Sequence, residues 1–198
     1  DPAIASFLVQ DIRKAMPVIA DLYYNRAWEE LNLIGITGTK GKSTTAYYVK
    51  YILDAYLLDH QKNRSGIISS IDTYDGVIQE ESHLTTPEAM DLHMHFRNAV
   101  NSHIEYMEME VSSQALKYDR VDGITFDVGV YLNISEDHIS PLEHPDFEDY
   151  FAAKLKIFQH CRTEYGRRPV GGYTKSRTAS ELHVDLLHTK PHGQYFWV

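Results

Sequence analysis

The sequence predicts an α/β fold built on a doubly wound, mostly parallel sheet. Short apolar runs with strand character alternate with segments whose apolar residues recur every three to four positions, as on one face of a helix. The run at 126–134 is almost wholly apolar, which is typical of a strand covered on both faces. Together these observations indicate parallel strands joined by helices that cover both faces of the sheet.

The first half of the chain supplies two expected helices and two expected strands. Apolar residues at helical spacing predict a helix over 4–24 that Pro17 interrupts. The apolar run 31–36 predicts the first strand, and after a glycine-rich turn an amphipathic helix is expected, with its apolar residues between Tyr48 and Tyr56. A β-rich run predicts the next strand at 66–71.

The second half continues the alternation. A helix opened by Thr86-Pro87 is expected to run to about Val100, with Pro87 at its first helical position. Strands are expected at 104–111 and 126–134, and a stripe of apolar residues from Phe147 to Phe158 predicts a further helix.

The last part of the chain has a different character. Residues 161–181 are rich in Arg, Gly, Thr and Ser without a sustained period, and only 194–198 resembles a strand. We therefore expect one domain over 1–198, with its core at 31–160 and a divergent or incomplete tail at 161–198.

Composition narrows the function classes. The 198 residues are 43% apolar and 24% charged, with only 11 Gly and 7 Pro, which excludes collagenous and disordered chains. The formal net charge of −9 and the lack of any Lys/Arg-rich run argue against a nucleic-acid partner. Cys161 is the single cysteine, so no internal disulfide is possible. With no membrane-length apolar run and no leader-like start, a cytoplasmic protein without a membrane partner is expected.

The glycine-rich turn has the chemistry of a phosphate-binding loop. Residues 38–43 read Gly-Thr-Lys-Gly-Lys-Ser between an expected strand and an expected helix. Backbone N–H groups and the helix N-terminus would face a phosphate, Lys42 would reach the β- and γ-phosphates, and the Ser43 hydroxyl would ligate Mg²⁺. The plainer alternative is a glycine-rich turn with an exposed lysine. The loop is a variant, because Ile36 stands where the usual motif begins with Gly.

Glu110 and His138 are candidates for the same site. Each follows an expected strand, and ligands bind at the carboxyl ends of parallel strands. With a hydroxyl, these side chains could hold a divalent metal beside the phosphates. Each also has a simpler explanation, since Glu110 could end a strand and His138 could lie on the surface of an acidic loop.

Lys154 lies on or beside the apolar stripe of the last expected helix, with Phe151 three residues before it and Phe158 four residues after it. Its stem could simply cover apolar surface while the ammonium reaches solvent. Alternatively, a desolvated lysine with a lowered pKa would react with CO₂ and become a carbamate, which turns a cation into an anion.

Four motifs together resemble the Mur ligase family, the ATP-dependent enzymes that build the peptidoglycan stem peptide. They are Gly-Thr-Lys-Gly-Lys-Ser-Thr (38–44), Met-Glu-Val-Ser-Ser-Gln-Ala-Leu (109–116), Leu-Asn-Ile-Ser-Glu-Asp-His (132–138) and Ala-Ala-Lys-Leu-Lys (152–156), in the family's order. The segment His-Leu-Thr-Thr-Pro-Glu (83–88) is similar to the MurE branch, which adds the third amino acid to UDP-N-acetylmuramoyl-L-alanyl-D-glutamate, or UDP-MurNAc-dipeptide.

The resemblance implies roles for these residues. ATP would bind Gly38, Thr39, Lys40, Gly41, Lys42, Ser43 and Thr44. Magnesium would be served by Ser43, Glu110, His138 and a carbamylated Lys154, and the catalytic residues would be Lys42, His138 and Lys154. The substrate would contact Thr85, Thr86, Ser112 and Arg120, whose planar guanidinium suits an anionic group.

The resemblance also implies that this chain is the central ATP-binding domain of a monomeric enzyme, without the N-terminal UDP-binding and C-terminal amino-acid-binding domains. The partners would be UDP-MurNAc-dipeptide and an amino acid, and residues 37–42 and 81–88 favour L-lysine over meso-diaminopimelate. Two alternatives stay open. One is another ligase of the Mur or folylpolyglutamate type, and the other is a nucleotide-binding module that is inactive by itself.

Overall fold

The computed structural model describes residues 8–141, 143–161, 172–173 and 184–185. The expected strand at 194–198 lies outside these residues. The main elements in chain order are α1 (Ile12–Tyr23), η1 (Ala27–Glu30), β1 (Asn32–Thr37), α2 (Lys42–Asp59), β2 (Gly66–Ile68), β3 (Asp72–Tyr74), β4 (Gln79–Glu81), α3 (Ala89–Asn101), β5 (Tyr106–Glu110), α4 (Ser113–Lys117), β6 (Val128–Tyr131), α5 (Phe147–Leu155) and η2 (Lys156–His160), and the pair β7 (Gly172–Tyr173) and β8 (Val184–Asp185) follows.

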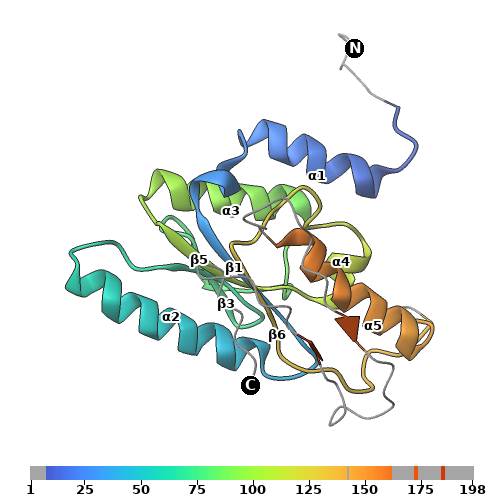
Figure 1. The fold of residues 1–198 in the computed structure, drawn as a ribbon. Helices are drawn as coiled ribbons and strands as arrows, with labels where there is room; N and C mark the ends of the chain where they lie inside the picture. The colour runs from blue at the N-terminus through green and yellow to red at the C-terminus, as the bar shows by residue number, and fades with distance from the viewer. Residues whose placement is uncertain (1–7, 142, 162–171, 174–183, 186–198) are drawn as a thin grey trace.

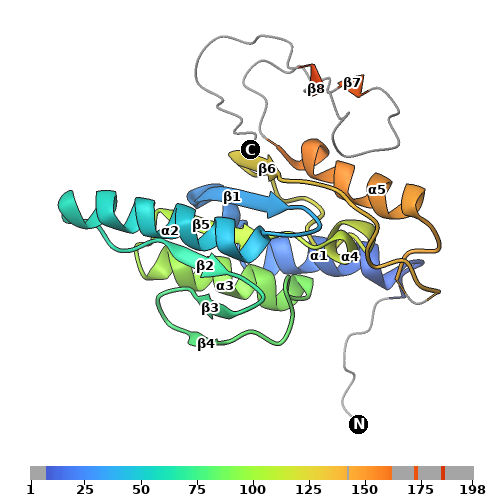
Figure 2. The same ribbon diagram turned by 90° about the horizontal axis from the view of Figure 1, so that it is seen from below.

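Six strands form the main sheet in the order β4-β3-β2-β5-β1-β6. The strands β2, β5, β1 and β6 run parallel, with Ile36 level with Glu110 on one side and with Val130 on the other. The strands β3 and β4 run antiparallel at one margin, and β6 lies toward the other (Figure 2). The α/β fold with a mostly parallel sheet, predicted from the alternation of elements, is thus confirmed.

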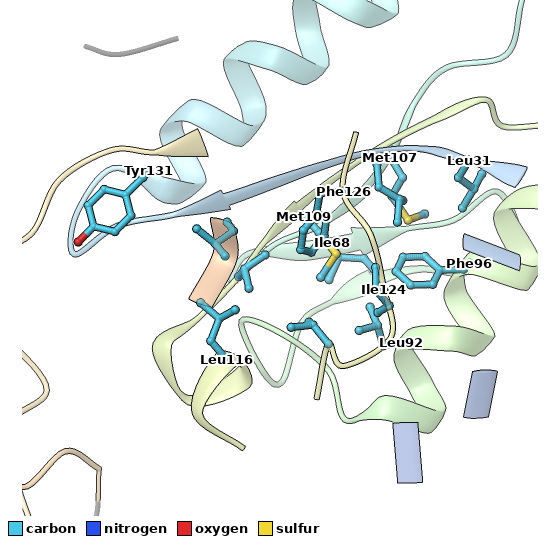
Figure 3. Packing of buried hydrophobic residues seen from close by; sticks show 14 of the residues in the cluster. Leu31, Ile68, Leu92, Phe96, Met107, Met109, Leu116, Ile124, Phe126 and Tyr131 are labelled. Atoms are coloured by element: carbon cyan, nitrogen blue, oxygen red, sulfur yellow. The ribbon is translucent and has the colours of Figure 1, made fainter. Parts of the chain in front are cut away.

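Two apolar clusters hold the helices to the sheet. The larger one joins α3, α4 and α5 to the face of the sheet that carries Leu33 and Met107, and Figure 3 shows its centre around Phe96, Met109 and Phe126. A smaller cluster around Ile36 and Ala46 holds α2 to the other face. Figure 1 accordingly shows α2 on the opposite side of the sheet from α1 and α3. None of the described helices is long and apolar enough to cross a membrane.

Several predicted boundaries were wrong. The expected strand 66–71 ends at Ile68, because Ser69 and the residues after it turn the chain into the β3–β4 hairpin, which was not predicted. Pro17 does not interrupt α1 but is buried inside it. Pro87 is not the first residue of α3, which begins at Ala89 after Glu88 as its N-cap.

The far margin of the sheet reaches the end of the continuously described chain. After α5 and η2, Cys161 forms an isolated parallel bridge with Phe126, and the Phe126 N–H donates to the His160 carbonyl oxygen at 2.6 Å. The chain packs closely there, since a Cβ added at Gly129 would lie 2.2 Å from the Cys161 sulfur. These contacts fasten η2 to the sheet and thereby fix α5, which carries Lys154.

Candidate active site

The glycine-rich loop joins β1 to α2 at the carboxyl edge of the parallel strands. Gly41, the N-cap of α2, has a φ of 83°. Gly38 has a φ of 154°, and a Cβ added there would lie only 3.0 Å from the Cβ of Leu132. Residues with side chains are strained in this region of backbone conformation, whereas glycine is not. The two glycines of the motif therefore stand where the turn requires them.

Asn133, just after β6, clamps this loop from the other side. Its Oδ1 accepts hydrogen bonds from the N–H groups of Thr39 at 3.1 Å and Lys40 at 3.0 Å, and its Nδ2 donates to the Lys40 carbonyl. The amides of Thr39 and Lys40 are thus used within the protein. The first N–H groups of α2 have no partners within the helix. These groups, rather than those of Thr39 and Lys40, are therefore the ones suited to bind an anion.

Two ammonium groups meet at one backbone carbonyl. The Nζ atoms of Lys42 and Lys154 donate to the carbonyl oxygen of Gly38 at 3.1 and 2.9 Å. Burial lowers the pKa of Lys42, an effect that the Glu110 carboxylate opposes. Burial also lowers the pKa of Lys154, which is only 2% exposed, to about 7, and the nearby Lys42 charge acts in the same direction. This concentration of positive charge suits a polyanion.

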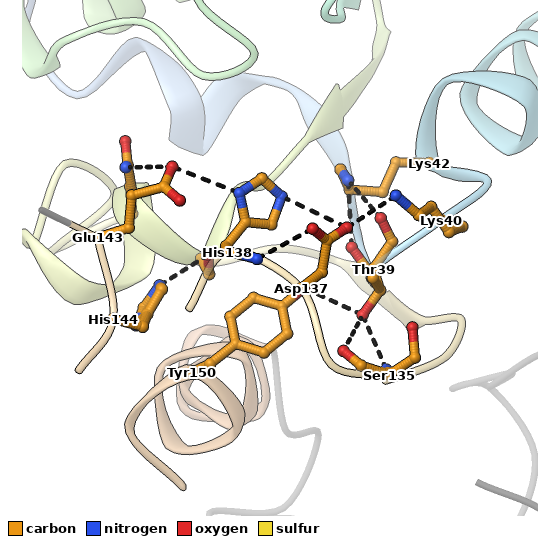
Figure 4. Close-up of polar contacts among 12 residues, drawn as sticks. Thr39, Lys40, Lys42, Ser135, Asp137, His138, Glu143, His144 and Tyr150 are labelled. Atoms are coloured by element: carbon orange, nitrogen blue, oxygen red, sulfur yellow. Dashed lines mark hydrogen bonds and ion pairs between the residues drawn. The ribbon is translucent and has the colours of Figure 1, made fainter. Parts of the chain in front are cut away.

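Tyr150 packs beside Lys154 and also contacts the glycine-rich loop. One turn before it on α5, the fully buried Tyr150 places its ring 4.8 Å from the Lys154 Nζ and its hydroxyl 3.0 Å from the Thr39 Oγ1. The Thr39 Oγ1 also accepts a hydrogen bond from the Ser135 N–H at 3.0 Å. The loop, the end of β6 and α5 are therefore tied together at Thr39, as Figure 4 shows.

Ser70 connects two of the predicted metal ligands. The hydroxyls of Ser43 and Ser70 are 3.0 Å apart, and both the N–H and the hydroxyl of Ser70 donate to the Glu110 Oε1, at 2.9 and 3.2 Å. Glu110 itself is 1% exposed at the end of β5. Ser43 and Glu110 thus lie at one place although 67 positions of sequence separate them. Ser70 was not predicted, and its only signal in the sequence is its position just after a strand.

His138 lies on the loop between β6 and α5, facing the glycine-rich loop (Figure 4). Its Nδ1 is 3.4 Å from the Glu143 Oε1, and its ring packs at 5.9 Å from that of Tyr150. The neighbouring Asp137 accepts a hydrogen bond from the Lys40 Nζ at 2.7 Å, which joins this loop to the glycine-rich one (Figure 4). His138 is therefore near the other candidates, but about half exposed.

The donor set at this edge is compatible with magnesium. A serine hydroxyl and a carboxylate are the hard oxygen donors that Mg²⁺ prefers, and Glu110 is buried and already oriented by Ser70. In the part of the chain that the structure describes, no group of three His, Cys, Asp or Glu side chains is arranged to hold a metal by itself. Oxygens from a bound phosphate would have to complete such a site.

The predicted substrate residues gather behind Glu110. The buried Thr86 hydroxyl donates to the Glu110 carbonyl at 2.8 Å and accepts from the Ser112 N–H at 3.0 Å. Arg120 donates to the Thr86 carbonyl at 3.3 Å and pairs with Glu88 at 2.5 Å. Thr85, beside them, is half-buried, and Thr44, at the start of α2, is exposed.

Comparison with known proteins shows the family to which the chain belongs. The sequence profile of the Mur ligase middle domain matches residues 36–167. The chain belongs to the Mur ligase family. The match covers the loop, Glu110, His138 and Lys154, which are the segments that carried the resemblance in the sequence.

Named relatives lie in the same family. The chain is 44% identical over 186 residues to the UDP-N-acetylmuramyl-tripeptide synthetase of Bifidobacterium longum, covering 93% of this chain and 33% of that protein. It is 45% identical over 162 residues to the UDP-N-acetylmuramoyl-L-alanyl-D-glutamate--L-lysine ligase of Enterococcus faecalis, covering 81% of this chain and 31% of that protein. The chain thus spans about a third of the length of these Mur ligases.

A solved structure agrees on the fold. A UDP-N-acetylmuramoyl-L-alanyl-D-glutamate--2,6-diaminopimelate ligase superposes with a TM-score of 0.61 at 24% identity, covering 80% of this chain and 31% of that one. The likeness at this level of identity supports the arrangement of strands and helices. It places the sheet described above within the Mur ligase architecture.

Proposed function

We propose that this chain is the ATP-binding central domain of a ligase that adds L-lysine, as the third amino acid, to UDP-MurNAc-dipeptide in peptidoglycan synthesis. The observation that carries the proposal is the convergence of Lys42 and Lys154 on the Gly38 carbonyl, beside the linked Ser43 and Glu110. The relatives named as lysine ligases supply the reaction class and the amino acid.

Residues 38–44 would hold the phosphates of ATP. The first amides of α2 and the Lys42 ammonium would bind the β- and γ-phosphate oxygens. Thr39 and Lys40 would contribute through the shape of the loop, because Asn133 already accepts their N–H groups. The Lys40 side chain is exposed and paired with Asp137, so its contribution would be mainly electrostatic.

Ser43, Glu110 and His138 would hold Mg²⁺ together with phosphate oxygens. When bound, the metal would neutralise charge that develops on the transferred phosphoryl group. Ser70 would keep the Glu110 carboxylate pointing toward Ser43 through the two hydrogen bonds described above.

Lys154 would act as a carbamate. A pKa of about 7 leaves a large neutral fraction of this amine near neutral pH, and only the neutral amine attacks CO₂. The ammonium first releases one proton, and the neutral amine then forms the new N–C bond with CO₂ and releases a second proton, so the side chain changes from a cation to an anion. An anion at this buried position would face Lys42 and would help to place a second Mg²⁺.

The chain's residues would then bring two anions together. Thr85, Thr86, Ser112 and Arg120 would orient the substrate so that its carboxylate attacks the γ-phosphate of ATP. The resulting acyl phosphate would be displaced by the amine of lysine, with release of ADP and phosphate. Lys42 would reduce the repulsion between the carboxylate and the phosphate oxygens. The whole enzyme would be a cytoplasmic monomer, with the UDP moiety and lysine held by segments beyond this chain.

One experiment tests the proposed reaction. The complete polypeptide is given ATP, Mg²⁺, UDP-MurNAc-dipeptide and one amino acid at a time, and phosphate release and amide formation are both measured. We expect product with L-lysine and product formation at least tenfold slower with meso-diaminopimelate. A factor of ten in rate corresponds to a difference of about 1.4 kcal/mol in activation free energy. If UDP-MurNAc-dipeptide gives no product but another acid substrate in its place does, the result would favour a different Mur or folylpolyglutamate-type ligase.

The same measurements apply to this chain by itself. It spans about a third of the relatives' length, so nucleotide binding without amide formation is the expected result for the isolated domain. Lys42→Ala is the test variant, because it removes one proposed phosphate-binding ammonium from an otherwise intact loop. Equal nucleotide affinity in this variant and in the wild type would contradict the assignment of the loop.

A further inference from the structure

The loop that carries His138 has an internal anchor. Residues 136–141 and 143–146 lie between β6 and α5, and the Ser140 N–H donates to the His144 carbonyl oxygen at 2.9 Å. His138 is about half exposed, whereas His144 is completely buried. The two histidines of this loop therefore have different roles, since only the second is enclosed by protein.

His144 connects two helices through both of its ring nitrogens. Its Nδ1 is 2.6 Å from the Asp149 Oδ2 on α5, and its Nε2 is 3.0 Å from the Ser113 Oγ at the start of α4. A carboxylate only accepts, so Nδ1 carries the proton and donates. In the neutral ring, Nε2 is left to accept the hydrogen bond from the Ser113 hydroxyl. The chain of hydrogen bonds thus runs from Ser113 through His144 to Asp149.

Further contacts from α4 hold the same loop. The Gln114 amide donates to the Glu143 Oε1 at 3.2 Å, and the Lys117 Nζ donates to the Glu143 carbonyl at 2.9 Å and to Asp149 at 2.6 Å. The Glu143 Oε1 also lies 3.4 Å from the His138 Nδ1. A continuous path of hydrogen bonds therefore links α4 to His138, and it passes through the loop that His144 anchors.

A serine, a histidine and an aspartate in this order resemble a hydrolytic triad, but burial excludes that use. Ser113 is 5% exposed, His144 is not exposed at all, and the ring of Tyr150 packs edge-on against His144 at 5.1 Å. No substrate carbonyl could reach the Ser113 oxygen. The arrangement can orient groups around it but cannot attack a substrate.

We propose that His144 is a positioning residue that, through Ser113 and Asp149, fixes the loop bearing His138 beside the glycine-rich loop, so that His138 can join Ser43 and Glu110 in holding a magnesium-bound nucleotide. This inference rests on the proposed function of that site. It also connects two groups of residues, because Ser113 directly follows Ser112 of the proposed substrate site. The start of α4 thereby supports both the substrate side and the metal side.

The test compares nucleotide binding with and without magnesium, using ATP and this chain. In Ser113→Ala and His144→Asn, we expect the dissociation constant for ATP to rise about tenfold with Mg²⁺ and less than about twofold in EDTA, as for the loss of one hydrogen bond that orients a ligand. A general loss of structure would weaken binding equally in both conditions. His60 is exposed at the end of α2, so His60→Gln is the matched control. It should leave the dissociation constant for ATP unchanged both with Mg²⁺ and in EDTA.

A double-mutant cycle separates the chain of hydrogen bonds from independent effects. His144→Asn keeps an amide near Asp149 but does not reach Ser113, so adding Ser113→Ala should weaken magnesium-dependent binding by no more than about another twofold. A product of the two single effects, about a hundredfold, would overturn the proposal. Equal losses with Mg²⁺ and in EDTA would also overturn it.

Amide hydrogen exchange supplies a readout that does not depend on nucleotide. Residues 136–141 and 143–146 should exchange faster in His144→Asn, while β1 and β5 stay protected. Unchanged exchange in this loop would overturn the positioning role even where ATP binds as proposed. If the wild-type chain binds no ATP in either condition, the proposed function fails, and the exchange data still decide whether His144 anchors the loop.

Discussion

Two lysines with little exposure differ in what surrounds their ammonium groups. On α2, the Lys50 Nζ lies 3.2 Å from the Asp54 Oδ2, contacts the Ser65 carbonyl and faces the ring of Tyr74. On α5, the Lys154 Nζ meets the Gly38 carbonyl, and its neighbour is a second ammonium, that of Lys42. Among the described residues, no carboxylate lies within ion-pair distance of Lys154.

The comparison shows how burial produces either structure or reactivity. A cation with little exposure and a carboxylate partner holds two segments together, here α2 and Ser65 just before β2. A buried cation beside a second cation releases its proton more easily, so its nitrogen becomes available for chemistry. Little exposure is common to both lysines, and the sign of the neighbouring charge separates them.

The largest expected effect is on catalysis. In the complete polypeptide, Lys154→Ala should lower the turnover number about a thousandfold, the size of loss seen when a group that stabilises a transition state is removed. Excess bicarbonate should not restore activity, since no amine is left to react. Lys50→Met should leave turnover within about threefold of the wild type at temperatures where it is folded. Near wild-type turnover in Lys154→Ala would refute the difference between the two regions.

A smaller effect concerns stability in the Lys50 region. Asp54→Ala would leave the Lys50 ammonium uncompensated and would also remove the acceptor of the Ser65 N–H and hydroxyl. We expect a loss of about 3 kcal/mol in the free energy of unfolding, as for other broken pairs with little solvent access. Denaturant unfolding measures it, with the exposed Asp59→Ala on the same helix as the control. A loss no larger than that of the control would show that Asp54 is not needed to compensate Lys50.

The smallest expected effect tests a carboxyl group beneath the same helix. Glu108 is fully buried on β5, neither of its oxygens has a hydrogen-bond partner among the described residues, and burial raises its pKa to about 7 against the opposing charge of Lys50. The folded protein therefore keeps this proton up to about pH 7, while the unfolded chain loses it near pH 4.5. The resulting stability is present below pH 4.5 and is lost as the pH rises through 7.

Replacement of this carboxyl by a neutral amide removes that dependence. Glu108→Gln should raise the free energy of unfolding by about 2 kcal/mol more at pH 8 than at pH 5, because the wild type loses about 1.4 kcal/mol of stability for each pH unit over which only its folded state holds this proton. Thermal unfolding at both pH values measures the difference. An equal change at both would show that Glu108 does not titrate in this range, and a loss at pH 8 would show that its charge is compensated in the folded state.

The sequence predicted the main parts of the fold because they depend on local patterns. The run 31–36 and the glycine-rich turn correspond to β1 and the loop before α2, since strand burial and positive φ values leave marks in consecutive residues. The β3–β4 hairpin was missed because β4 (Gln79–Glu81) is only three residues long and all three residues are exposed, so it has no apolar pattern. The five-residue helix α4 is too short for a helical period to be recognised.

The residues of the site likewise divide into those that the sequence predicted and those that it did not. Residue types and their order indicated phosphate, magnesium and a special lysine. Asn133, Ser70 and Tyr150 were not predicted, because each acts on residues from 27 to 111 positions away in the chain. Such contacts exist only after the strands are arranged side by side.

Lys154 illustrates the limit most clearly. Its position on an apolar stripe left two interpretations open, a stem that covers apolar surface or a desolvated amine, and both fit the same helical pattern. The sequence by itself determined the α/β alternation, the glycine-rich turn before α2 and the membership of a ligase family, because these follow from neighbouring residues and their order. Only the tertiary structure decided that Lys154 is buried beside Lys42, since the pKa of a group depends on the charges and solvent around it, wherever in the chain they originate.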